Sequence, residues 1–107
     1  MQKIQIAIEG PDAVEATKAL MAIPALSGEW QMPEGDRKGV LATLAIIVGI
    51  VGGTITAAEQ IRRWWQEWKK GKSGKTIEKA VIVVKEKRVL LEGASVDEIK
   101  TVLDELN

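Results

Sequence analysis

The residues whose types and spacing most resemble a chemical site are two short glycine-lysine segments, Gly71-Lys72-Ser73 and Gly74-Lys75-Thr76. Each is similar to the end of a phosphate-binding loop, in which backbone amides and a lysine bind nucleotide phosphates. The complete motif also requires a glycine five residues before the Gly-Lys pair, where this chain has Gln66 and Lys69. A phosphate-binding loop leads from a strand into a helix, whereas here a helical pattern leads into a strand pattern. The sequence therefore favours a solvated basic linker over a nucleotide site.

Few other side chains could support catalysis. The chain contains no Cys and no His, which removes disulfides, thiolate ligands, imidazole bases and Ser-His or Cys-His nucleophilic pairs. Zinc, haem and iron–sulfur centres therefore lack their usual ligands. Lys plus Arg and Asp plus Glu number 15 each, so no net charge attracts nucleic acid. We expect a protein that is not an enzyme, has no metal or cofactor and does not bind nucleic acid.

The uncharged stretch from Gly39 to Ala58 dominates the rest of the chain. A helix of this length reaches roughly 30 Å, which is the thickness of the hydrocarbon core of a bilayer. The stretch is therefore a transmembrane candidate, and a buried helix covered by protein on all sides is the alternative. Charged residues lie close to both ends of the stretch, namely Asp36, Arg37, Lys38, Glu59, Arg62 and Arg63.

Small residues recur at every fourth position of this stretch, and two of them form a GxxxG pattern. On a helix they would form one face along which two backbones could approach closely, as in membrane helix dimers. The adjacent glycines Gly52 and Gly53 are the weakest point for helix continuity, and Thr54 could cap a new helix there. One straight helix and a helical hairpin are therefore both allowed. The residues of the stripe are Ala45, Gly49, Gly53 and Ala57.

The residues after the apolar stretch continue the helical spacing but become amphipathic. Ile61, Trp64, Trp65 and Trp68 share one face with Ala57, whereas Arg62 and Arg63 belong to the opposite, basic face. Tryptophans beside basic residues are typical of a membrane-interface belt, where the ring is apolar and its N–H lies near the headgroups. The alternative is that the three rings pack on the sheet or on a neighbouring subunit.

The flanking segments predict an α+β protein. Alternation of Ile4, Ile6 and Ile8 predicts a strand over 3–9, followed by a helix over 13–22 and a short strand over 29–32. Strands over 76–85 and 88–92 form a hairpin, and Ser95 and Glu98 form a capping box that begins the last helix. The predicted order is β-α-β (1–35), a long glycine-rich apolar helix or helical hairpin (36–70), and β-β-α (75–107), which share one small sheet in a single domain.

The first ten residues alternate polar and apolar side chains, which does not fit a secretory signal. A cytoplasmic location follows as the expectation for the folded part. Association with the inner membrane would follow only if the central stretch meets lipid.

The order of features resembles the effector-associated constant component family, small proteins encoded beside NTPase-regulated and protease- or caspase-linked bacterial conflict systems. The family commonly has a methionine before the glycine that opens the apolar segment, where this chain has Lys38. The resemblance implies a non-enzymatic adaptor or partner of an effector or protease in defence, without active-site residues. It covers nearly the whole chain and is carried by the opening strand and helix, Pro33-Glu34-Gly35, the glycine cluster Gly49, Gly52 and Gly53, the Trp- and Arg-containing segment 61–70, and the closing hairpin and helix.

Two functions remain open at the level of the sequence. The first is a self-associating homo-oligomer that uses the Gly49 and Gly53 stripe, with the tryptophans contacting a membrane or the next subunit, and with pore formation as one outcome. It predicts that Gly53→Leu abolishes the oligomer or its association with lipid. The second is a soluble binding module whose apolar helix is buried in its own core and which recruits a partner through a sheet edge or the acidic last helix. It predicts a monomer in the absence of detergent.

Overall fold

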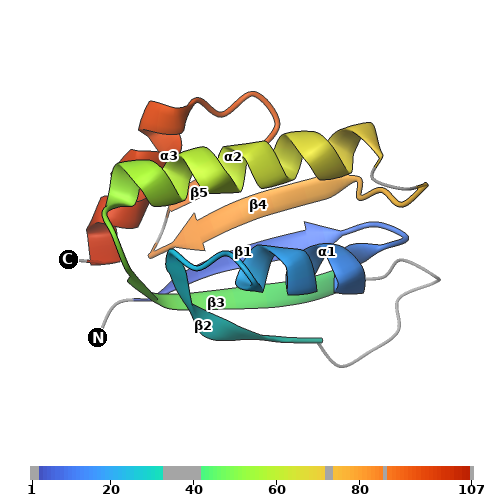
Figure 1. Ribbon diagram of the computed structural model, residues 1–107, viewed down its shortest axis with the longest axis horizontal. Helices are drawn as coiled ribbons and strands as arrows, with labels where there is room; N and C mark the ends of the chain where they lie inside the picture. Colours follow the sequence, from blue (N-terminus) through green and yellow to red (C-terminus); the bar gives the residue numbers. More distant parts are fainter. Residues whose placement is uncertain (1–2, 33–41, 72–73, 86, 107) are drawn as a thin grey trace.

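The computed structural model describes residues 3–32, 42–71, 74–85 and 87–106. Within these residues three α-helices pack against one five-stranded sheet (Figure 1). The predicted α+β class is confirmed. The predicted turn at 33–35, the charges at 36–38, the first residues of the apolar stretch and the Lys72-Ser73 pair lie outside the described residues. The elements are β1 (Ile4–Glu9), α1 (Ala13–Met21), β2 (Leu26–Gln31), β3 (Ala42–Ile50), α2 (Thr54–Lys70), β4 (Lys79–Val84), β5 (Lys87–Leu90), α3 (Val96–Leu103) and a 3-10 turn η1 (Asp104–Leu106).

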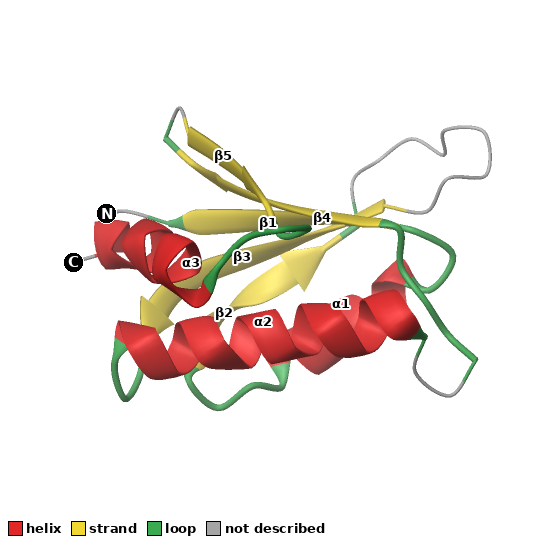
Figure 2. Ribbon diagram, turned by 90° about the horizontal axis from the view of Figure 1, so that it is seen from above, coloured by secondary structure: helices red, strands yellow, loops and turns green. Residues whose placement is uncertain are grey.

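The sheet has the order β2-β3-β1-β4-β5, and every neighbouring pair is antiparallel. The first six elements form a β-α-β-β-α-β unit in the split arrangement of ferredoxin-like folds, to which β5 and α3 are added. All three helices lie on one side of the sheet, as Figure 2 shows from above. The other side of the sheet carries no helix among the described elements.

Alternation along β1 explains how the sheet joins the helix layer. Ile4, Ile6 and Ile8 are completely buried and face the helices, whereas the residues between them are partly exposed on the opposite side. The register places Ile6 beside Ala45 of β3 and Ile82 of β4, which are also buried. The three central strands therefore share one core face, and the sequence prediction of a half-buried first strand is confirmed.

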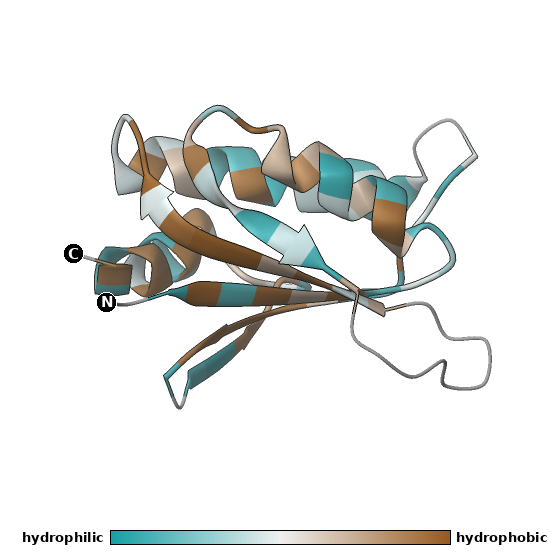
Figure 3. Ribbon diagram, turned by 90° about the horizontal axis from the view of Figure 1, so that it is seen from below, coloured by the Kyte–Doolittle hydropathy of each residue, from teal (hydrophilic) through white to brown (hydrophobic). Residues whose placement is uncertain are grey.

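The prediction of an apolar helix or helical hairpin over residues 39–58 is wrong for residues 42–50. Residues 42–50 form β3, which pairs with β1 on one side and β2 on the other. Its β-branched residues, such as Ile46, Ile47 and Val48, favour an extended strand over a helix. The strand lacks polar alternation because both of its faces are apolar, and Figure 3 shows β3 as hydrophobic along nearly its whole length. An apolar run of this kind resembles a membrane helix in the sequence alone.

The chain turns at the predicted weak point. Gly52 and Gly53 adopt φ angles of 88° and 103°, a backbone region that glycine enters without steric cost. Helix α2 then begins at Thr54, with Gly53 as its N-cap residue. Thr54 does not cap the helix; its hydroxyl instead donates a hydrogen bond of 2.7 Å to Asp104 Oδ1 in η1.

None of the described helices combines the length and the apolar composition that a membrane span requires. Helix α2 has 17 residues, and it is amphipathic rather than apolar on all sides. The predictions of a transmembrane helix and of a GxxxG helix face are therefore wrong for the described residues.

The closing helix follows its sequence signature. The Glu98 amide donates to Ser95 Oγ at 3.1 Å, and the Ser95 amide donates to Glu98 Oε1 at 3.2 Å, which completes the predicted capping box. Ile99 and Leu103 are completely buried against the core. Helix α3 thus covers the end of the sheet beside α2.

Candidate functional site

The residues predicted to form a helix stripe do not share a face. Ala45 lies on β3 with its side chain in the core, and Gly49 lies near the end of that strand, opposite Ser27. Gly52 and Gly53 form the turn, and a Cβ atom at either position would meet no atom within 4 Å. Only Ala57 lies on a helix, where it is buried. The stripe therefore offers no surface for association between helices.

The predicted tryptophan face of α2 lies in the core. Trp64, Trp65 and Trp68 are 4%, 6% and 5% exposed, and Ile61 beside them is completely buried. The Trp64 Nε1–H donates a hydrogen bond of 2.8 Å to the Ala16 carbonyl of α1. A membrane-interface belt would require these rings at the surface, whereas here they join α2 to the rest of the core.

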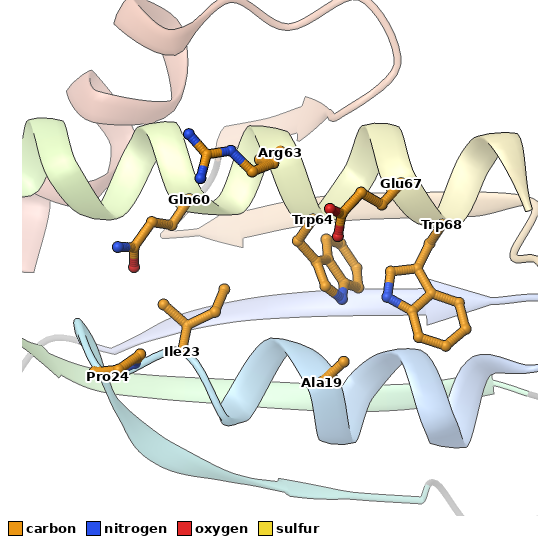
Figure 4. A pocket seen from close by; sticks show the side chains of 8 residues that line it. All are labelled: Ala19, Ile23, Pro24, Gln60, Arg63, Trp64, Glu67 and Trp68. Atoms are coloured by element: carbon orange, nitrogen blue, oxygen red, sulfur yellow. The ribbon is translucent and has the colours of Figure 1, made fainter. Parts of the chain in front are cut away.

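Arg62 and Arg63, the two arginines of the predicted membrane or oligomer surface, contact different parts of the fold. Arg62 Nε donates a hydrogen bond of 3.3 Å to the Ala94 carbonyl, just before α3 begins. Arg63 lines a pocket between α2 and the end of α1 (Figure 4).

This pocket has a volume of about 230 Å³, which is below the roughly 300 Å³ at which ligand pockets usually begin. Two polar atoms that line it, Gln60 Oε1 and Trp68 Nε1, are buried and have no hydrogen-bond partner among the described residues. One is an acceptor and the other a donor, and because Gln60 and Trp68 lie eight positions apart on α2, each would need a polar partner of its own. The pocket contains no acid pair and no nucleophile next to a base. Its lining residues are Ala19, Ile23, Pro24, Gln60, Arg63, Trp64, Glu67 and Trp68.

The second Gly-Lys segment, Gly74-Lys75-Thr76, binds side chains at the start of α1. Lys75 pairs with Glu15 of α1, and this hydrogen bond raises the pKa of the Lys75 ammonium. The amide of Thr76 donates a hydrogen bond of 2.8 Å to the Asp12 carboxylate. Two carboxylates therefore occupy the donors that a phosphate group would need. Among the described residues no group of three or more Asp or Glu is placed to bind a metal ion.

A further surface is the side of the sheet that faces away from the helices, which no described helix covers. We call it the open face. Sequence reasoning missed it because the residues of β3 were assigned to a helix; the apolar runs in β3 and β4 were the available signal. The strand registers place fourteen side chains on the open face: Glu29 and Gln31 of β2; Ala42, Leu44, Ile46 and Val48 of β3; Gln5, Ala7 and Glu9 of β1; Lys79, Val81 and Val83 of β4; Arg88 and Leu90 of β5.

The central part of the open face carries six apolar residues that lie outside the core cluster, with the polar Gln5 among them. We call these six residues the apolar band: Ala7, Leu44, Ile46, Val81, Val83 and Leu90. None of them belongs to the core cluster or packs against it. Exposure varies across the band, from 3% for Val81 to 55% for Leu90 at the edge. The band is thus a small hydrophobic cluster that no described helix covers.

Charged residues of opposite sign flank the band. Glu29 on the β2 edge and Arg88 on the β5 edge are both exposed and form no ion pair with the described residues. The four aromatic residues of the chain are all tryptophans, and none lies on the open face. The face therefore lacks the aromatic rings on which sheet-type RNA-binding proteins stack bases.

No protein-family model, no curated protein and no solved structure matches this chain. The resemblance to the effector-associated constant component family therefore stays a prediction. The role in a bacterial defence system rests on that resemblance alone, and neither the fold nor the site adds support to it.

Proposed function

We propose that the protein is a non-enzymatic binding component that packs its open face against another protein. The observation that carries this proposal is the apolar band, which lies on the open face outside the core cluster and is flanked by Glu29 and Arg88, two charges that form no ion pair with the described residues. Contiguous exposed apolar surface on a folded domain commonly marks an interaction site. An apolar centre with a charged rim is also the usual composition of a protein interface.

The proposal keeps the sequence-based expectation of a non-catalytic binding protein but moves the interaction surface. The sequence placed it on a helix stripe, a sheet edge or the acidic last helix, whereas the apolar area lies on the open face of β1, β3 and β4. The absence of a clustered acid pair, of histidine and of cysteine supports a role in binding rather than catalysis.

The test compares neighbouring residues that point to opposite sides of one strand. Ile46 lies on the open face and Ile47 lies in the core, so Ile46→Thr and Ile47→Thr apply the same chemical change on the two sides. We expect Ile46→Thr to lower the free energy of unfolding by less than about 1 kcal/mol, because the new hydroxyl can be hydrated. We expect Ile47→Thr to cost about 3 kcal/mol, because it buries a hydroxyl and leaves a cavity.

Urea unfolding followed by circular dichroism measures both values. Val83→Thr and Val84→Thr repeat the comparison on β4, where Val84 is buried in the core. Equal costs on the two sides would mean that the apolar band is required for folding. That result would remove the reason for assigning the band to a partner.

A further inference from the structure

The open face has an arrangement that is nearly symmetric about β1. Two strands lie on each side of β1, with β3 and β2 on one side and β4 and β5 on the other. Side chains of neighbouring strands form rows across the sheet. One row reads Gln31, Leu44, Ala7, Val81 and Leu90, and the next reads Glu29, Ile46, Gln5, Val83 and Arg88.

We propose that the occupant of the open face is a second copy of this chain, related by a two-fold axis that runs parallel to β1. This inference rests on the proposed function, because it names the partner of the same surface. A rotation of 180° about this axis places each row of one copy over the same row of the other copy, with the order of the strands across the row reversed. Leu44 then lies over the partner's Val81, and Ile46 lies over the partner's Val83.

Charge complementarity selects this axis. Because the rows are reversed, Glu29 of each copy lies over the partner's Arg88, which gives two equivalent ion pairs at opposite ends of the interface. An axis perpendicular to the strands would instead bring the two Glu29 side chains to one end and the two Arg88 side chains to the other. Like charges facing each other oppose association, so the first arrangement is favoured.

The residues on the axis itself are compatible with close packing. Ala7 faces the partner's Ala7, which has a small side chain, and Gln5 faces the partner's Gln5, whose amide can both donate and accept a hydrogen bond. Glu9 faces the partner's Glu9, but each of these carboxylates has Lys79 as its register neighbour on β4. Two lysines therefore balance this pair of like charges.

The shape and size of the face also suit a dimer. Figures 2 and 3 show β5 bent away from the helices and β2 close to them, so the two-fold places the raised edge of each copy over the lower edge of the other. Five strands about 4.8 Å apart and about 20 Å long give a face of roughly 480 Å². Two such faces bury roughly 1,000 Å² in total, which is at the lower limit for a specific interface and indicates a dimer of modest affinity.

Charge reversal tests the arrangement. In Glu29→Arg, two arginines would face each other at both ends, and in Arg88→Glu two acids would do so. We expect each single change to weaken dimerisation about tenfold, and the double variant to restore it, because the pairs then form with reversed polarity. Sedimentation velocity over the micromolar concentration range measures the dissociation constants. Glu59→Arg, on the exposed side of α2, is the matched control and should leave the dimer unchanged.

The outcomes separate this inference from the proposed function. Weakening by both single changes with recovery in the double variant supports the two-fold arrangement. A dimer that Ile46→Lys abolishes but that neither charge reversal affects would overturn the arrangement and leave the open face as the binding surface. A protein that stays monomeric would overturn the second copy as occupant, while the stability comparison at Ile46 and Ile47 still decides the proposed function. A dimer that persists with Ile46→Lys would use another surface and would overturn the second copy as the occupant of the open face.

Discussion

Replacement of Trp64 and of Trp68 by phenylalanine should have clearly different costs, although the two residues are equally buried on the same face of α2. Trp64 Nε1 has a partner in the Ala16 carbonyl at 2.8 Å, whereas Trp68 Nε1 has none among the described residues. Each change removes similar apolar area, which costs about 1 to 2 kcal/mol. The difference therefore arises from the hydrogen bond.

At Trp64 the lost hydrogen bond adds about 1 kcal/mol, so we expect a total cost of about 2 to 3 kcal/mol. At Trp68 the change removes a buried donor that is not satisfied, and the relief of about 1 to 3 kcal/mol offsets the loss of area. We therefore expect Trp68→Phe to lie within about 1 kcal/mol of the parent protein. A domain of this size has a free energy of unfolding of about 5 to 15 kcal/mol, so both variants should remain folded.

Urea unfolding followed by far-ultraviolet circular dichroism measures the two costs without reliance on tryptophan fluorescence. Equal slopes against urea concentration are the control that the unfolded states remain comparable. Equal costs for Trp64→Phe and Trp68→Phe would refute the reasoning. They would mean that the Trp68 N–H has a partner in the pocket beside α2, and that this pocket holds a polar group as part of the fold.

Two further predictions concern the backbone and the response to acid. Gly28→Ala should lower the free energy of unfolding by about 3 kcal/mol, because its Cβ would lie 1.9 Å from the Ile46 carbonyl oxygen. Gly49→Ala should be tolerated, because the nearest atom to its Cβ would be Ser27 Cβ at 3.7 Å. Urea unfolding measures both values, and equal costs would contradict this prediction. Hydrogen bonds from Thr54 and Lys100 hold the pKa of Asp104 below its ordinary value of 3.8, so their stabilisation is present above 3.8 and is lost as the pH falls through the lowered pKa. The stability difference between the parent protein and Thr54→Val should therefore shrink in acid, and a constant difference across unfolding curves at several pH values would contradict this assignment.

Local signals in the sequence predicted the first strand and the last helix of the chain well. The alternation of Ile4, Ile6 and Ile8 identified β1, and the Ser95 capping box identified the start of α3, because both depend on neighbouring residues alone. The glycine pair at 52–53 was correctly identified as the place where a helix would break. Strand β3, which precedes this glycine pair, was predicted as a helix. Its strand conformation depends on pairing with β1 and β2, and these strands are distant from it in the sequence.

The candidate site was predicted poorly for the same reason. The tryptophans were recognised as one helical face, but the sequence left open whether core or lipid covered them, and the helix layer of the fold decided it. The open face could not be derived at all before the strand order was known. Its fourteen positions come from five strands, and only the registers bring Glu29 and Arg88 to opposite ends of one row.

The error over β3 is itself informative about function. A strand with one face in the core and one face in water reads as alternating polar and apolar residues. A strand that is covered on both faces reads as a continuous apolar run, as β3 and the middle of β4 do. The helices cover one face of each strand, and no described element covers the other. The continuous run that imitates a membrane helix in the sequence is thus the pattern expected of strands whose second cover is another protein molecule. In the proposed dimer, the reversed rows of a second copy of this chain would supply that cover.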